Sequence, residues 1–200
     1  MVLFVFIKKG EKIKMKKRLG GFKNIHVAKV VSDGTYQAPV LITGAKSIEA
    51  ELAYENVQFY ADNAIDYSDY IFSGGEGTLT VAGLSMDEYQ TLFGSTVTDG
   101  GVLVKSNDIA PELAILFERN KLGTSEKVYY ALYACKFAPP AISAQTLEGG
   151  IEEETVELSF TVRELADGEV FYMVDSETHA GVKADEWYAS VQKAGAPAGV

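Results

Sequence analysis

From about residue 24 onward, apolar and polar side chains alternate in several stretches bounded by glycine, aspartate or asparagine. Residues 47–54 alternate in this way, and the same pattern recurs at 79–81 and 156–162. Successive side chains of a strand point to opposite faces of its sheet. The alternation therefore predicts half-buried antiparallel strands, each with one wet face.

Two further stretches, 113–117 and 128–137, are apolar or aromatic at nearly every position. Strands of this kind are buried on both faces, so we expect them to be central in a sheet or to face a partner. Ten or so short strands in one domain predict a mostly β fold of the sandwich or barrel type. The remaining predicted strands lie at 27–31, 36–42, 57–61, 101–105 and 169–174.

One internal helix is predicted at 85–94. Ser85 and Glu88 have the spacing of a capping box, and Gly94 suits the left-handed position that follows a helix. The apolar residues between them fall on one helical face, so this helix should lie against the sheets. A second, C-terminal helix is predicted at 184–192 from the same spacing, and residues 194–200, which lack a pattern, are expected to form a flexible tail.

The N-terminal residues carry a signal that does not concern folding. The codons of residues 8–12 (Lys-Lys-Gly-Glu-Lys) can form a purine-rich string that resembles a bacterial ribosome-binding site, shortly upstream of Met15. We therefore expect translation to start at Met15 and residues 1–14 to be a translated leader, with a genuine N-terminal extension as the alternative. Residues 15–200 fit a single domain, because one core of this size can bury most of the chain.

Charge is unevenly distributed along the chain. Nine of the 18 basic residues lie in the first 30 positions, and the remaining 170 residues hold nine basic against 27 acidic ones. A body this acidic repels a phosphate backbone, which argues against an ordinary DNA-binding protein. The Lys-rich N-terminal end is more typical of a solvated tail than of a nucleic-acid contact.

No membrane or secretion signal is predicted. The apolar run at 1–7 is far shorter than the roughly 20 residues that a membrane span needs. A secretory leader places its positive charges before the apolar stretch, whereas here the lysines follow it.

The sequence offers little chemistry. Cys135 stands among apolar and aromatic residues, which predicts a buried, unreactive thiol, and neither His26 nor His179 belongs to a zinc-binding pattern. Residues 74–77 (Gly-Gly-Glu-Gly) are expected to form a hairpin turn rather than a nucleotide-binding loop. Asp62, with Asp66 and Asp69, matches no known ligand spacing. We therefore expect no catalytic residue, no metal and no cofactor, although a site made of carboxylates alone leaves little trace in a sequence.

From Gly20 onward the order of features resembles the major tail protein (tail tube protein) family of long non-contractile-tailed phages of Gram-positive bacteria. The resemblance covers about residues 20–175 and concerns order and character, because the family has no catalytic signature. The stretches that carry it are Gly21-Phe22-Lys23-Asn24-Ile25-His26-Val27, Phe59-Tyr60-Ala61-Asp62-Asn63, Gly77-Thr78-Leu79-Thr80-Val81, the capped helix ending in Leu92-Phe93-Gly94, Ala114-Ile115-Leu116-Phe117, Tyr129 to Phe137, and Leu158 to Glu164.

The resemblance implies two packed antiparallel sheets with one flanking α-helix, and subunits that assemble as hexameric rings. Stacked rings would form the tail tube, in which each subunit contributes strands to a continuous inner barrel around a conduit for DNA. The implied partners are other copies of the chain and tail proteins such as the tape measure, tail tip and terminator. The implied location is the virion tail, after synthesis in the bacterial host cytoplasm.

Two surfaces follow from this picture. DNA must slide through the tube without binding, so we expect an acidic lumen with Glu49, Glu51 and Glu157 as candidates. Residues 60–75 hold too much apolar surface for a loop that stays in water, and in related tubes a long loop at about this place reaches the neighbouring ring. We expect them to form an assembly loop that becomes ordered on polymerisation, with a strand hairpin packed on its own core as the alternative. The candidate residues of this loop are Tyr60, Asp62, Ile65, Tyr67, Tyr70 and Phe72.

Other functions remain possible at this point. A carbohydrate- or surface-binding β-sandwich would need an exposed aromatic platform, which Tyr67, Tyr70 and Phe72 could supply. An enzyme without a recognisable motif is a third class. Other phage structural proteins, including the tube of a contractile tail, share the same sequence character.

Overall fold

The computed structural model describes residues 17–144, 146, 154–179 and 182–194. The predicted leader at 1–14 lies outside the described residues, as does the predicted tail apart from its first residue. Within the described chain the elements are β1 (Leu19–Ser32), β2 (Thr35–Tyr36), β3 (Val40–Leu41), β4 (Ala45–Ala61), β5 (Ala64–Val81), α1 (Met86–Phe93), β6 (Thr96–Thr98), β7 (Gly101–Leu103), β8 (Leu113–Lys121), β9 (Lys127–Phe137), β10 (Val156–Arg163), β11 (Phe171–Asp175) and α2 (Ala184–Trp187).

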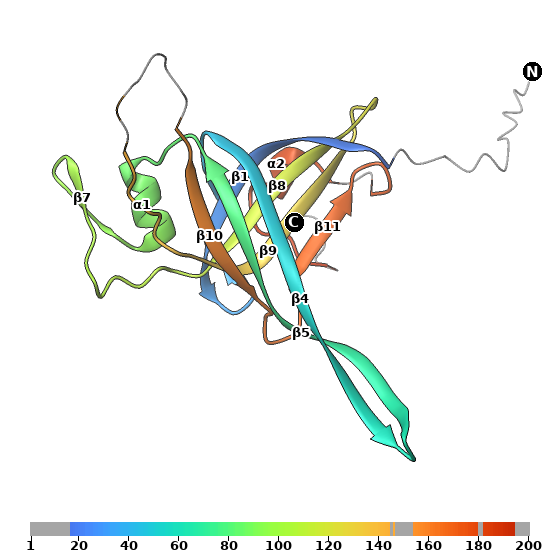
Figure 1. Cartoon of the computed structure of the whole chain (residues 1–200). Coiled ribbons are helices and arrows are strands. Elements are labelled where there is room, and N and C mark those ends of the chain that lie inside the picture. The colour runs from blue at the N-terminus through green and yellow to red at the C-terminus, as the bar shows by residue number, and fades with distance from the viewer. Residues whose placement is uncertain (1–16, 145, 147–153, 180–181, 195–200) are drawn as a thin grey trace, which may run out of the picture.

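Nine of the strands form one antiparallel sheet, and β6 and β7 form a separate two-stranded sheet. The main path runs β2-β1-β8-β9-β10-β5-β4, so the apolar strands β8 and β9 are central, as their sequences predict. Strand β9 also divides the sheet, because one part of it pairs with β11 and the part that follows pairs with β10 (Figure 1). The predicted mostly β class, with antiparallel sheets, a flanking helix and a short C-terminal helix, is confirmed.

The larger hydrophobic core lies between the β1-β8-β9 part of the sheet and the β10-β5-β4 part. It includes Leu79, Leu158 and Phe160 from the alternating strands, and Leu92 from α1. Helix α1 has the predicted capping box, since Ser85 Oγ accepts a hydrogen bond from the Glu88 amide and Glu88 Oε2 accepts one from the Ser85 amide. Cys135 is fully buried in this core, and burial raises the pKa of its thiol, as expected for an unreactive cysteine.

A second core covers the other face of β8 and β9 and explains why both of their faces are apolar. Trp187 is 1% exposed there and packs near the rings of Tyr129 and Tyr172. Helix α2 is only one turn long, shorter than the predicted 184–192. Beyond it, the backbone carbonyl of Gln192 accepts a hydrogen bond from the Tyr133 hydroxyl, so the chain is tied to the sheet by tertiary contacts instead of continuing its helix.

Several boundaries differ from the sequence predictions. The strand expected at 36–42 is two short pieces, β2 and β3, which both pair with β1. The strands expected near 48–54 and 57–61 are one continuous strand, β4. Gly74 to Gly77 form no turn: they lie inside β5, where Gly74 has a φ of 122° beside a register shift. That shift is a β-bulge, a feature that glycine tolerates within a strand.

Candidate functional site and assembly surfaces

Strands β4 and β5 form one long hairpin whose outer half projects from the body of the molecule (Figure 1). Its turn is made by Asp62 and Asn63, both in the left-handed conformation with φ of 50° and 61°. Two successive left-handed residues are the requirement of a type I′ hairpin turn, and aspartate and asparagine tolerate that conformation. We define residues 54–73, beyond the bulge between Ala53 and Tyr54, as the distal hairpin.

The distal hairpin exposes an unusual amount of apolar surface. Isolated two-stranded hairpins are marginally stable in water, and exposed apolar patches on soluble proteins commonly mark interaction sites. Tyr54 pairs with Phe72 on one face, and Phe59 pairs with Tyr67 on the other, so neither face is wholly polar. The exposed apolar residues are Tyr54, Phe59, Tyr60, Ile65, Tyr67, Tyr70 and Ile71, each between 46% and 69% exposed.

The predicted assembly residues all lie on this hairpin, but not in the predicted form. The expectation of a coil is wrong, because residues 64–81 form strand β5, which pairs with β4 from Ala64 to Val81 with register shifts, one of them between Phe59 and Tyr60. The alternative of a strand hairpin is confirmed for the secondary structure, but this hairpin is not packed on its own core, since Tyr60, Tyr67 and Tyr70 remain exposed. No metal-binding cluster of acidic residues occurs in the part of the chain that the structure describes, Asp62 included.

The alternation of β5 also bears on the aromatic platform considered for a carbohydrate-binding protein. Tyr70 and Phe72 share one face of the strand, whereas Tyr67, three positions before Tyr70, lies on the other. The Tyr67 hydroxyl donates a hydrogen bond to Asp69 on its own face, which raises the pKa of Tyr67. The three rings therefore do not form one flat platform.

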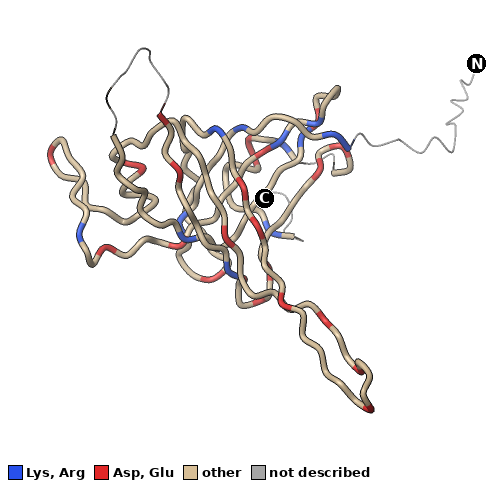
Figure 2. Tube along the Cα trace, in the orientation of Figure 1, with Lys and Arg blue, Asp and Glu red and all other residues tan. Residues whose placement is uncertain are grey.

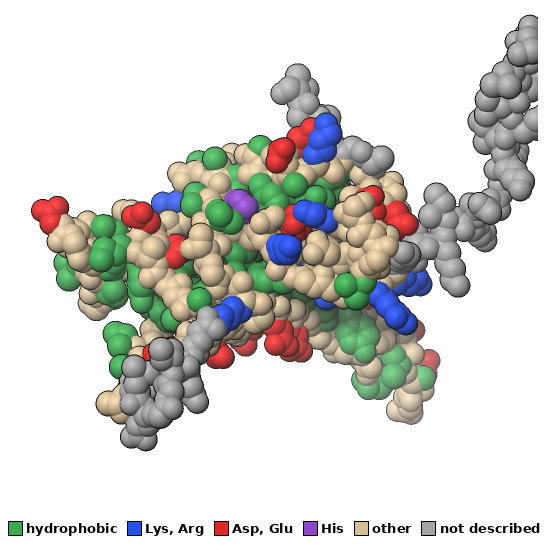
Figure 3. All heavy atoms as spheres, turned by 90° about the horizontal axis from the view of Figure 1, so that it is seen from above, with side chains coloured by type: hydrophobic (Ala, Val, Ile, Leu, Met, Phe, Trp, Pro, Cys, Tyr) green, Lys and Arg blue, Asp and Glu red, His purple; other side chains and the backbone are tan. Residues whose placement is uncertain are grey.

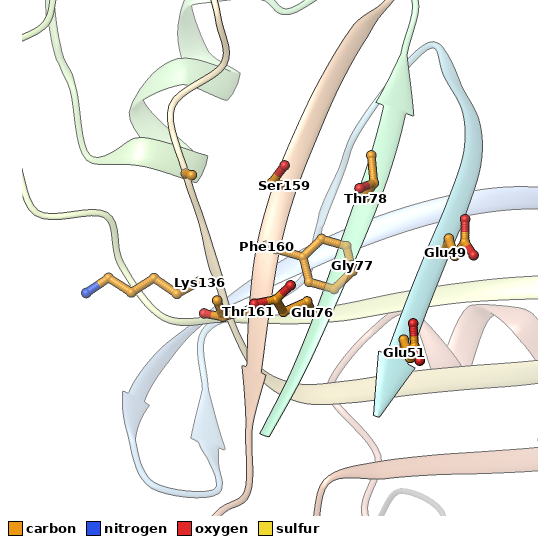
Figure 4. A pocket seen from close by; sticks show the side chains of 10 residues that line it. Glu49, Glu51, Glu76, Gly77, Thr78, Lys136, Ser159, Phe160 and Thr161 are labelled. Carbon is orange, nitrogen blue, oxygen red and sulfur yellow. The ribbon is translucent and has the colours of Figure 1, made fainter. Parts of the chain in front are cut away.

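A second candidate surface is the outer face of β4, β5 and β10, which is polar and acidic. Glu51 lies directly opposite Glu76, and Glu49 lies opposite Thr78. Glu157 lies opposite Thr80 on the same face. Figure 4 shows Glu49, Glu51 and Glu76 on adjacent strands around a shallow hollow of about 380 Å³. The three predicted glutamates thus share one face.

Sequence analysis missed Glu76, which belongs to this acidic face. It alternates with Gly75 and Gly77, and that glycine pattern was interpreted as a turn. Within the described residues, neither Glu51 nor Glu76 forms a salt bridge, although carboxylates directly opposite each other destabilise a sheet. The acidic face therefore costs stability in the isolated subunit, which suggests that the charge serves a function.

The hairpin and the acidic face meet along β4, which is the last strand on the main path of the sheet. A model of the phage tail tube protein family matches residues 6–194 of the chain. The chain belongs to the phage tail tube protein family. This membership makes it a structural protein of the phage tail and places it in the virion tail, as the sequence resemblance predicts.

Comparison with solved structures adds a remote similarity. The chain is similar to the anti-feeding prophage cap, described as the AFP tube terminating cap, at 9% sequence identity and a TM-score of 0.43. The alignment covers 76% of this chain and 87% of the cap. No curated protein matches the chain.

In this tail tube family member, the charged residues of the distal hairpin are all acidic: Glu55, Asp62, Asp66 and Asp69. Figure 2 shows acidic residues and no basic ones on the projecting hairpin. No helix among the described residues is long and apolar enough to cross a membrane. Both candidate surfaces include strands of the β4–β5 hairpin.

Proposed function

We propose that the chain is the repeating subunit of a phage tail tube, in which hexameric rings stack to form the conduit for DNA ejection. The observation that carries this proposal is the free edge of β4, which has 17 residues and pairs only with β5 among the described strands. A long edge strand exposes a row of unpaired backbone N–H and C=O groups. Pairing with neighbouring copies in a closed ring removes such an edge.

The acidic face is assigned to the lumen of this tube. The main path of the sheet ends in β10, β5 and β4. If the free edge of β4 pairs with a neighbouring subunit to close a barrel, β4, β5 and β10 become part of the barrel wall. These strands carry Glu49, Glu51 and Glu157. A negatively charged wall repels the DNA phosphates, so the DNA passes through without binding. The opposed carboxylates of the acidic face destabilise the single subunit, and we assign them a function only in the assembled tube.

The distal hairpin is assigned to contacts between successive rings. Complete burial of a large apolar side chain contributes about 1.5–3 kcal/mol. Association costs on the order of 4–15 kcal/mol in lost freedom of motion, so several such side chains per subunit provide free energy of the required size. The same tube would contact a tape measure protein, a tail tip and a terminator, and it requires no cofactor.

Negative-stain electron microscopy of the purified protein tests this function. We expect rings with sixfold averages, or tubes, for the wild type. Replacing Tyr67 and Tyr70 with serine should leave folded subunits that no longer stack, because the apolar contact between rings is lost. The matched control replaces Leu103 and Val104 with serine, which removes comparably exposed apolar surface from the region of β7.

The control should still form tubes. A wild-type protein that remains monomeric at high concentration would contradict the proposal. Tubes of normal length from the Tyr67→Ser, Tyr70→Ser variant would contradict the role of the hairpin, even if the chain is a tube subunit.

A further inference from the structure

Polar side chains from two strands converge on one buried carboxylate of the strand between them. Glu118 on β8 is 1% exposed, and a carboxylate is rarely buried this deeply unless it is paired. Its Oε1 atom accepts a hydrogen bond from Lys127 Nζ at 2.6 Å and another from Asn24 Nδ2 at 3.1 Å. Because both nitrogens bond the same oxygen atom, the lysine amine and the asparagine amide are close neighbours.

Strand pairing brings the three residues together. Strand β8 lies between β1 and β9, with Lys23 opposite Glu118 on one side and Tyr129 opposite it on the other (Figure 1). Lys127 comes two positions before Tyr129, so it shares a face of the sheet with Tyr129 and Glu118. Asn24 lies at a register shift of β1 and has a φ of 55°, a conformation that asparagine tolerates. Irregularities of this kind redirect a side chain, and this one reaches Glu118.

The environment of Glu118 holds its carboxylate in place. Its second oxygen, Oε2, accepts a hydrogen bond from the Tyr188 hydroxyl at 3.3 Å, and Tyr188 packs against the second core. The hydrogen bond between Lys127 and Glu118 raises the pKa of Lys127, so its amine carries a proton at neutral pH. Only the small unprotonated fraction is nucleophilic, and that fraction grows as the pH rises.

These groups are sufficient to form an amide bond between two side chains. The unprotonated amine of Lys127 is a nucleophile, and Asn24 Cγ is an uncharged acyl carbon. Glu118 is hydrogen-bonded to both and can move protons between them. The folded chain holds the reactants next to each other, which replaces a bimolecular encounter. Asn24 is exposed, so released ammonia can enter the solvent.

A second buried lysine nearby lacks an acceptor of this kind. Lys121 is 3% exposed and forms salt bridges with Asp175 and Glu177, each at 2.5 Å. The acyl carbons beside it belong to carboxylates, and an ionised carboxylate resists attack by an amine. An ion pair is therefore the stable arrangement at Lys121, whereas the uncharged amide of Asn24 can react with Lys127.

Other conspicuous surfaces of the subunit are mainly apolar. A groove of about 590 Å³ behind β4 is lined by aromatic rings, such as those of Phe117 and Tyr130, and by the cations Lys46 and Arg119. Hydrophobic side chains, Ile109 among them, are also exposed near α1 and β7, and Figure 3 shows green side chains at that end of the molecule. Apolar side chains offer neither a nucleophile nor an acyl carbon, so these surfaces are suited to packing rather than to covalent chemistry.

We propose that Lys127 and Asn24 form an intramolecular isopeptide bond, with Glu118 as the group that transfers protons. Glu118 takes a proton from the Lys127 ammonium, and the neutral Nζ attacks Asn24 Cγ. The bond from Nζ to Cγ forms and the bond from Cγ to Nδ2 breaks. Of the three protons on Nζ, one stays on the new amide and two pass through Glu118 to Nδ2, which leaves as an ammonium ion.

The bond would join β1 to β9 across β8 and would need no oxidant, metal or cofactor. It would keep the N-terminal strand in the sheet when the subunit is pulled or heated, because a covalent link between distant residues restricts the unfolded chain. The proposal does not depend on the tube function, since the reaction takes place within one subunit.

Mass spectrometry of the purified full-length protein tests the bond. We expect a fraction of the folded protein to be lighter by one ammonia, and this fraction to grow during incubation at mildly alkaline pH, because the amine must lose its proton. After digestion, a branched peptide should join the segment that contains Asn24 to the segment that contains Lys127. A folded wild type that keeps its full mass after alkaline incubation would overturn the proposal and leave the cluster as a salt bridge.

Substitutions separate this reaction from other losses of ammonia. Lys127→Arg and Glu118→Gln should keep the full mass, the first without a nucleophile and the second without proton transfer. Lys23→Arg is the matched control: it changes an exposed lysine beside Asn24 and should still give the branched peptide. Loss of ammonia that persists in Lys127→Arg would show that Asn24 cyclises on its own backbone, and the proposal would be wrong.

Discussion

At the scale of single residues, two glycines allow β5 to carry the acidic face on one side and a close-packed core on the other. Gly75 and Gly77 flank Glu76, and both lie opposite core residues of β10, Val162 and Phe160. A Cβ atom at Gly77 would lie 2.3 Å from a ring carbon of Phe160 and 2.5 Å from the carbonyl oxygen of Glu49. The missing side chain therefore makes room for the buried Phe160 ring.

Gly77→Ala should lower the free energy of unfolding by about 1–3 kcal/mol, because an added methyl group in a packed core forces neighbouring atoms to move. Denaturant unfolding followed by the fluorescence of Trp187, the one tryptophan of the chain, measures this. Gly83→Ala is the matched control, since no atom lies within 4 Å of its added Cβ, and we expect a change within about 0.5 kcal/mol. Equal stability of the two variants would show that Phe160 can move aside.

At the scale of elements, the two halves of the β4–β5 hairpin differ in what stabilises them. The half that includes Leu79 and Val81 is buried in the larger core. The distal hairpin has backbone pairing and ring contacts such as Tyr54 with Phe72, but its side chains are mostly exposed. Local opening costs little free energy where few apolar contacts are buried, so the distal half should open far more often than the body.

Hydrogen exchange should detect this difference. In monomers we expect weak protection of the amides at 56–71, and in assembled tubes strong protection, because docking on another subunit buries the hairpin. Strands β8 and β9, which are covered on both faces, provide the internal control and should be protected in both states. Strong, equal protection of residues 56–71 in monomers and tubes would mean that the hairpin is stable without a partner.

At the scale of the whole molecule, charge divides the surface into regions with different roles. The acidic face formed by Glu49, Glu51, Glu76 and Glu157 lies on β4, β5 and β10, whereas the groove behind β4 is lined by cations and aromatic rings. In the proposed tube the first region faces DNA.

Reversing charge at Glu49, Glu51 and Glu76 to lysine should slow genome ejection from particles, because a basic wall binds phosphates. The delay should shrink as salt is raised, since counterion release makes such binding strongly salt-dependent. The control reverses three acidic residues outside the acidic face, Asp87, Asp99 and Asp108, and should eject at the wild-type rate. If both variants eject at the same rate at low salt, the acidic face does not line the lumen.

Local patterns were sufficient for much of the fold. The capping residues Ser85, Glu88 and Gly94 predicted α1 because caps are made by neighbours in sequence. Apolar or aromatic residues at nearly every position of 113–117 and 128–137 predicted strands buried on both faces, and a core does cover each face of β8 and β9. Alternation also placed Glu49, Glu51 and Glu157 on wet faces, since that follows from the period of a strand alone.

Only the tertiary structure decided where those faces and strands lie. Alternation shows that Glu49 and Glu51 share a face, but not that β10 brings Glu157 to the same side or that β5 adds Glu76. It could not show that the distal hairpin projects beyond the body, because a strand has the same period whether or not another element covers it. Strand pairing joins residues far apart in the chain, so the acidic face and the apolar groove exist only once the sheet has formed.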